Sequence, residues 1–94
     1  MILGRVCGTL VATKKEEALR GFKFLIVEEF TIYKKPTGKY HIAVDTVGAG
    51  AGELVLIVSG SSARQTARTT KKPVDAAIVA IVDNISLNNT GEEK

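Results

Sequence analysis

The part of the chain that most constrains its fold is residues 44–64, which read V-D-T-V-G-A-G-A-G-E-L-V-L-I-V-S-G-S-S-A-R. Glycines at positions 48, 50 and 52 give the backbone access to positive φ three times, and the alanines between them keep the loop thin. We therefore expect another stretch of polypeptide to pack closely against this loop.

The apolar run at residues 54–58 has the length and the β-branched content of a strand, but it shows no alternation with polar residues. Such a strand is covered on both faces. A chain of 94 residues rarely has enough mass to cover both faces of a strand by itself. The sequence therefore predicts that a neighbouring subunit covers one face.

Composition excludes several classes of protein. The 13 basic and 10 acidic residues give a net charge of +3, far from the concentrated positive charge of a dedicated nucleic-acid binder. Cys7 is the single cysteine, so no internal disulfide forms, which fits a reducing cytoplasm. No basic N-terminal region precedes an apolar run, and no run approaches about 18 apolar residues, so we expect a cytosolic protein without a signal peptide or membrane span.

The first half of the chain reads as three strands. Residues 2–13 alternate as a strand, in which Gly4 and Gly8 predict a bend or a close backbone approach. The charged residues 14–17 form an exposed connection. Residues 22–33 form a second strand and residues 40–47 a third, joined into a hairpin by a turn at residues 34–39, which contain Pro and Gly. In the second strand one side should face the core: Phe22, Phe24, Ile26, Phe30 and Ile32.

The second half reads as two strands around a short helix. Residues 59–62 offer helix N-cap chemistry, and residues 63–67 are the expected helix. Residues 74–87 fit either an apolar helical stripe or a strand buried on both faces, and their β-branched density favours the strand. Residues 88–94 lack apolar side chains and are expected to be a disordered tail behind a single domain at residues 1–87.

Five strands with one short helix between the fourth and fifth predict an all-β fold, a small five-stranded barrel of the OB type. The strands at 54–58 and 74–87 would fill the barrel with one face and meet adjacent subunits with the other. A contact between unlike surfaces repeats head to tail and closes into a ring when the rotation divides a full turn.

Catalytic, metal and phosphate sites find little support in the sequence. The G-A-G-A-G loop lacks the Lys-Ser/Thr of a P-loop and does not have the spacing of the dinucleotide fingerprint. His41, Asp45, Ser61 and Ser62 have the residue types of a hydrolase triad but no nucleophile elbow. Cys7 and His41 are too few to build a zinc site. We therefore expect no catalytic residue, no metal and no cofactor.

Binding of single-stranded nucleic acid is the main alternative, because OB barrels often bind single strands. Lysine pairs at 14–15, 34–35 and 71–72, with Arg64 and Arg68, would trace a groove for the backbone. Acidic residues interleave with these lysines, and the phenylalanines fall on the side assigned to the core, so stacking platforms would be missing. Asp45, Glu53 and Arg64 fit either solvated loop charges or ion pairs within or between subunits.

Four segments in order resemble the vertex-protein family of bacterial microcompartments, the pentameric shell proteins of carboxysomes and ethanolamine-type organelles. They are M-I-L-G-R-V-C-G-T-L-V-A-T at residues 1–13, V-D-T-V-G-A-G-A-G-E at 44–53, G-S-S-A-R at 60–64 and P-V-D-A-A-I-V-A-I-V-D at 73–83. Together they extend the resemblance over roughly residues 1–87. The resemblance implies the same barrel architecture.

The resemblance implies a structural protein rather than an enzyme, a homo-pentamer that caps the five-fold vertices of a polyhedral shell in the cytoplasm beside hexameric shell proteins. It implies no particular cargo pathway, because the family looks alike across compartments, and it does not say which loop lines a pore or which residues meet the hexamers. The residues expected in oligomer or pore loops are Gly48, Ala49, Gly50, Ala51, Gly52, Glu53, Gly60, Ser61, Ser62 and Arg64.

Overall fold

The structure is a computed structural model that describes residues 1–13, 15–66, 69 and 75–88. The regular elements in these residues are five strands and two short 3-10 helices. They are β1 (Ile2–Leu10), η1 (Glu17–Leu19), β2 (Phe24–Phe30), β3 (Pro36–Asp45), β4 (Leu54–Ser59), η2 (Gly60–Arg64) and β5 (Ala76–Ile81).

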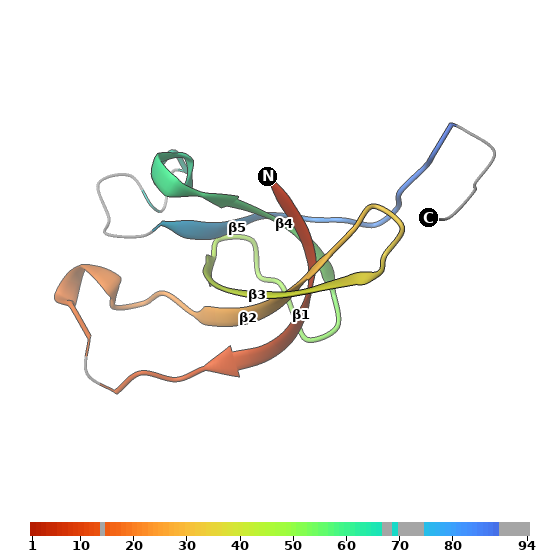
Figure 1. Ribbon diagram of the computed structural model, residues 1–94. Coiled ribbons are helices and arrows are strands. Elements are labelled where there is room, and N and C mark those ends of the chain that lie inside the picture. The colour runs from red at the N-terminus through yellow and green to blue at the C-terminus, as the bar shows by residue number, and fades with distance from the viewer. Residues whose placement is uncertain (14, 67–68, 70–74, 89–94) are drawn as a thin grey trace.

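The strands close into a barrel in the order β1-β2-β3-β5-β4 (Figure 1). Neighbouring strands are antiparallel except for β3 and β5, which pair in parallel through Val44 with Ala77 and Asp45 with Ile78. Closure of the barrel satisfies the sheet edges that an open sheet of this size would leave unpaired. The predicted small five-stranded barrel is confirmed.

The barrel interior is filled by small and β-branched side chains. Val55 and Ile57 of β4 are 0% exposed, while Leu56 between them points outward and is only half-buried. The inner face of β4 is therefore covered as predicted, and its outer face is covered only in part within one chain. The buried residues of this core are Val6, Leu25, Val27, Ala43, Ala49, Val55, Ile57 and Ile78.

Gly4 marks the closest approach between β1 and β2. A Cβ at this position would lie 2.5 Å from Val27 Cγ1 and 2.6 Å from the Glu28 carbonyl oxygen, so no side chain fits. Four residues later the register of β1 against β2 shifts between Val6 and Gly8, which is a β-bulge. The predicted close backbone approach in this strand is confirmed.

A second, smaller core lies outside the barrel wall, where the two 3-10 segments meet β3 and β5. Its buried members are Val44, Ala63 and Ala77. Partly buried side chains pack around them: Leu19, Phe22, Phe24, Val58 and Val79. This cluster fixes η2 to the barrel through Ala63, which is 0% exposed.

The prediction for the core-facing side of residues 22–33 is wrong in its main point. Leu25 and Val27 point into the barrel, at 2% and 0% exposed, whereas Ile32 is 56% exposed. Phe22 and Phe24 are partly buried, but they pack against the second core. The period-two pattern was uninformative here because both faces of F-L-I-V carry apolar side chains and both find apolar partners.

The hairpin between β2 and β3 is confirmed, but its turn precedes the predicted 34–39. The Thr31 amide donates to the Lys35 carbonyl at 2.8 Å, and the Lys34 amide donates to the Thr31 carbonyl at 2.9 Å. Lys34 adopts the left-handed conformation with φ of 62°, a conformation that a glycine was expected to supply in this turn. Pro36 is the first residue of β3, a position at which a strand tolerates proline.

The remaining boundaries also differ from the expectations. The short helix between β4 and β5 exists, but it is the 3-10 turn η2 at Gly60–Arg64 rather than a helix at 63–67. β1 ends at Leu10, and β5 ends at Ile81, beyond which residues 82–88 have no regular structure. Of the predicted tail, residues 89–94 lie outside the described residues. No helix within the described ranges is long and apolar enough to cross a membrane.

Candidate assembly surfaces

The glycine-rich loop between β3 and β4 is held by a single carboxylate. Asp45 is 5% exposed, and its Oδ1 accepts hydrogen bonds from the amides of Val47, Gly48 and Ala49 at 3.0, 3.1 and 3.2 Å. A short acidic side chain that accepts successive amides stabilises a tight turn. Ala49 is 1% exposed and belongs to the barrel core, so the loop is also fixed through its own side chain.

The second half of the loop is bound to β1. Glu53 Oε1 accepts the Gly50 amide at 2.6 Å, and the Gly52 amide donates to the Val6 carbonyl at 2.8 Å. Arg5 Nη1 donates to the Gly52 carbonyl at 2.6 Å, and its guanidinium lies 5.4 Å from the centre of the Phe30 ring. Together these contacts leave Gly48, Ala51 and Gly52 as the exposed tip of a rigid loop.

Two of the three glycines in this loop use the left-handed conformation. Gly48 and Gly52 have φ of 77° and 81°, and a Cβ at either position would meet nothing within 4 Å among the residues that the structure describes. Gly50, by contrast, does not have positive φ, and a Cβ there would meet only Glu53 Oε1 at 3.5 Å among the described residues. The described residues therefore do not crowd the exposed glycines of the loop.

The second predicted loop, Gly60–Arg64, is η2 itself. Gly60 has φ of 62°, and its amide donates to the Asp75 carbonyl at 2.8 Å. Gly60, Ser61 and Arg64 are exposed. Because β4 joins the two loops and rises about 3.3 Å per residue, they lie roughly 17 Å apart at opposite ends of that strand (Figure 1). One chain therefore does not bring the predicted residues into one site.

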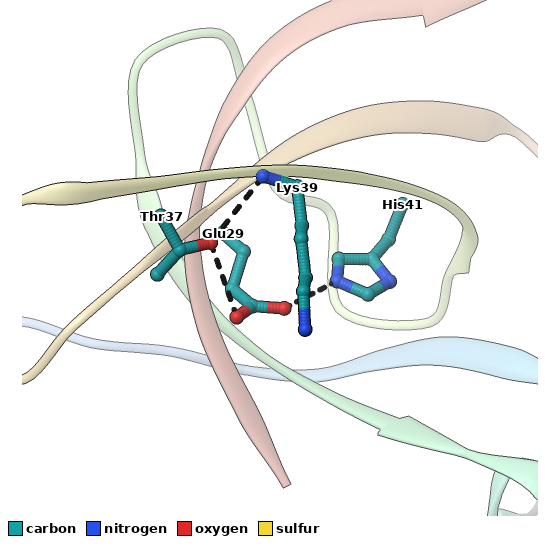
Figure 2. Close-up of polar contacts among 4 residues, drawn as sticks. All are labelled: Glu29, Thr37, Lys39 and His41. Carbon is teal, nitrogen blue, oxygen red and sulfur yellow. Dashed lines mark hydrogen bonds and ion pairs between the residues drawn. The ribbon is translucent and has the colours of Figure 1, made fainter.

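A polar cluster on β2 and β3 was not expected from the sequence. His41 Nε2 lies 2.7 Å from Glu29 Oε1, and the Thr37 hydroxyl donates to Glu29 Oε2 at 3.2 Å (Figure 2). The hydrogen bond from His41 is the largest cause that lowers the pKa of Glu29 below its ordinary value, with Thr37 and the charge of Lys39 adding to it. The Lys39 amide in turn donates to the Thr37 hydroxyl at 3.3 Å.

His41 therefore pairs with a carboxylate rather than with a serine nucleophile. The arrangement of His41, Asp45, Ser61 and Ser62 considered as a triad is not assembled, because Asp45 holds the glycine loop and both serines lie in η2. Within the described ranges no group of three His, Cys, Asp or Glu side chains is placed to hold a metal ion. In this chain Asp45 holds the glycine loop, and the pair of Glu29 and His41 joins β2 to β3.

An open pocket of about 360 Å³ lies on the outer side of the barrel, where β1 runs between β2 and β4. Leu3 pairs in register with Phe30 on one side and with Leu56 on the other, so the three side chains form an apolar row across three strands. Met1 and Ile32, 86% and 56% exposed, stand at its edge. We call this row and its edge the β1–β2–β4 groove.

A different apolar patch lies on the outer side of β3. Tyr40 and Ile42 are 61% and 53% exposed, and Ile42 is paired in register with Ile26 of β2. The Tyr40 hydroxyl donates to Glu28 Oε2 at 3.4 Å, and the Glu28 charge is the main cause that raises the pKa of Tyr40. A single chain therefore exposes apolar side chains on two separate faces.

Comparison with known proteins identifies the family. The family described as "Ethanolamine utilisation protein EutN/carboxysome" matches residues 1–83. The carboxysome shell vertex protein CcmL of Thermosynechococcus vestitus is 46% identical over 89 residues, which cover 95% of this chain and 90% of that protein.

Solved structures agree with the sequence comparison. CcmL of Gloeobacter violaceus superimposes with a TM-score of 0.89 at 44% identity, over 95% of this chain and 92% of that one. The structure described as "GrpN pentameric microcompartment shell protein from Rhodospirillum rubrum" has a TM-score of 0.86 at 46% identity, over 94% and 100% of the two chains. The resemblance inferred from four segments is confirmed, and the chain belongs to the EutN/CcmL family of carboxysome and bacterial microcompartment shell vertex proteins.

Proposed function

We propose that five copies of this chain form a ring that caps the five-fold vertices of a microcompartment shell. The observation that carries the proposal is the match of nearly the whole chain, both in sequence and in its closed barrel, to shell vertex proteins, one of which is described as pentameric. The role is structural and needs no catalytic group. The protein would reside in the shell, within the cytoplasm.

Geometry supplies the mechanism. A flat sheet of six-fold tiles cannot close into a polyhedron without five-fold points. A ring of five identical subunits joined by a heterologous contact provides such a point, because the same interface repeats until the rotation completes a full turn. We propose that hexameric shell proteins surround this ring and contact its outer rim.

We propose that the two predicted loops serve assembly in different places, one near each end of β4. The rigid tip of the glycine loop at 48–53 has open space around Gly48 and Gly52, which suits close approach by a neighbouring subunit or by its own copies around an axis. Gly60, Ser61, Ser62 and Arg64 of η2 form the second candidate contact. Residues 1–87 would act as one domain in this assembly.

Contacts with hexamers are proposed for exposed connections on the rim. Residues 34–39 are exposed beside the β2–β3 turn, and residues 15–17 lead into η1, whereas Lys14 lies outside the described residues. Binding of single-stranded nucleic acid, the alternative, has less support. Phe22, Phe24 and Phe30 are all partly buried, so they do not offer a free stacking surface.

Native mass spectrometry of the purified protein tests the ring. We expect a dominant species of five chains at micromolar concentration, because the outer face of β4 and the patch on β3 are uncovered in one chain. A persistent monomer under these conditions would contradict the proposed function.

A further inference from the structure

The segment that follows β5, residues 82–88, is attached to its own barrel at its start, and Val82 and Ile85 are half-buried. The Val82 amide donates to the Leu54 carbonyl at 2.8 Å. Beyond it, none of residues 83–88 makes a hydrogen bond to another described residue. The segment leaves the barrel and extends away from it (Figure 1). We call residues 82–88 the C-terminal arm.

The C-terminal arm has the alternating apolar pattern of an extended segment that binds to another protein surface. Ile85 and Leu87 are separated by one residue, so in an extended chain both point to the same side. Leu87 is 40% exposed in the single chain. An extended segment with free backbone groups and apolar side chains on one side is the form in which peptides add to another protein.

The β1–β2–β4 groove of the same chain is a candidate binding surface for such an arm. No residue of the C-terminal arm lines the β1–β2–β4 groove, whose walls are the apolar row of Leu3, Phe30 and Leu56. The groove has room for more than one aliphatic side chain. Leu56 is also the outward-facing residue of β4, the strand whose unbroken apolar run predicts cover on both faces.

The length of the arm fits contact with a second copy. Seven extended residues span about 23 Å, and the two shorter dimensions of the molecule are 23 and 20 Å. The arm can therefore cross the width of a neighbouring barrel. Each chain offers one arm and one groove, the one-to-one ratio that a ring of identical subunits joined by unlike surfaces requires.

We propose that in the ring the C-terminal arm of each subunit lies in the β1–β2–β4 groove of the next, with Ile85 and Leu87 against Leu3, Phe30 and Leu56. This proposal rests on the proposed pentamer and adds its means of closure. The arm covers the outer face of β4, and it increases the contact area beyond that of two barrels touching, which helps to reach the roughly 800 Å² per partner that stable interfaces bury.

Disulfide trapping tests the placement of the arm. In a Cys7→Ser background, Leu87→Cys is combined with Ile32→Cys at the edge of the groove. We expect oxidation to give reducible covalent ladders of up to five chains. The matched control pairs Leu87→Cys with Val11→Cys, an exposed apolar position outside both surfaces, and a second pair uses Ile42→Cys on the β3 patch. The proposal would be overturned if the protein remains pentameric and ladders form only from the pair of Leu87→Cys with Ile42→Cys. It would also be overturned if a pentameric protein gives no ladders from any pair.

A charge placed on the arm tests its contribution. We expect Leu87→Asp to lose the five-chain species in native mass spectra while its circular dichroism still reports a folded β-protein. Val11→Asp makes the same change at a position that is 83% exposed and should keep the ring. Pentamers of Leu87→Asp that resist dilution as well as the wild type would contradict the arm. A wild-type monomer would instead overturn the proposed function itself.

Discussion

At the scale of single residues, the features that decide the fold are close contacts that admit one side chain or none. Gly4 lies against β2 with no room for a methyl group, and Asp45 holds the amides of three loop residues. The pair of Glu29 and His41 ties β2 to β3 on the side away from the exposed Tyr40. We expect each of these contacts to contribute to the free energy of unfolding.

We expect Gly4→Ala to destabilise the protein by about 1 to 3 kcal/mol, because the added Cβ collides with the backbone of Glu28 and forces the strands apart. Gly8→Ala on the same strand is the control. There the new methyl meets the Cδ1 of Ile26 at 3.2 Å, the end of a flexible side chain, and the loss should be smaller. Denaturant unfolding compares the two, and equal losses would contradict the packing described for Gly4.

The lowered pKa of Glu29 predicts a pH dependence. Because folding favours the ionised carboxylate, its contribution to stability is present above the ordinary pKa of 4.5 and is lost as the pH falls through the lowered folded value. Wild type should therefore melt above Glu29→Gln at pH 7, and this difference should vanish in strongly acidic buffer. It should also shrink in a His41→Gln background. A difference that is the same at every pH would show that ionisation is not its source.

At the scale of elements, the glycine loop between β3 and β4 combines a left-handed backbone conformation at two glycines with a proposed role in assembly. Its rigid tip is set by Asp45, Glu53 and Arg5, while the glycine at position 50 has no positive φ and no crowding in one chain. A side chain would be strained at Gly52 but not at Gly50, so stability and assembly can be tested at different glycines of one loop. Substitutions can separate the two.

We expect Gly52→Ala to lower the free energy of unfolding by about 1 to 2 kcal/mol, because an L-residue at φ of 81° is strained. Gly50→Ala should leave the melting of the isolated chain unchanged, and it should weaken the pentamer if the loop lies at a subunit junction. Thermal melting and native mass spectrometry measure the two effects. A Gly52→Ala protein as stable as wild type would contradict the conformation assigned to the loop.

Strands bounded by strong turn signals were readable from the sequence, and contacts that depend on register were not. Residues 54–58 were found because glycines flank an unbroken apolar run. The Glu29–His41 pair was missed because Glu28 pairs with Tyr40 and Phe30 with Pro36, so extra residues of β3 lie opposite Glu29. No spacing rule indicates such an irregularity.

The arm was missed for a different reason. Its apolar alternation at Ile85 and Leu87 continues that of β5, and the sequence does not mark Ile81 as the end of the strand. Whether an extended segment pairs within its own sheet or leaves it depends on tertiary context. The assignment of residues 48–53 and 60–64 to oligomer or pore loops stays a prediction, and one chain places these two segments at opposite ends of β4.

At the scale of the whole molecule, a barrel this small leaves apolar side chains on two outer faces and a C-terminal arm of which residues 83–88 make no hydrogen bond to another described residue. The exposed side chains on these faces include Met1, Ile32, Tyr40 and Ile42. Assembly into a ring would cover these side chains. The chain belongs to the shell vertex family, which places such a ring at the vertices of a shell. We therefore propose that the ring closes the shell.

Electron microscopy of shells from a strain that lacks this gene, with no paralogue present, tests that claim most directly. Facets should still assemble, because flat sheets need only six-fold tiles, but the particles should become elongated or remain open, and expression of the protein should restore closed polyhedra. Closed, roughly isometric shells with an intact permeability barrier in the deletion strain would contradict the account.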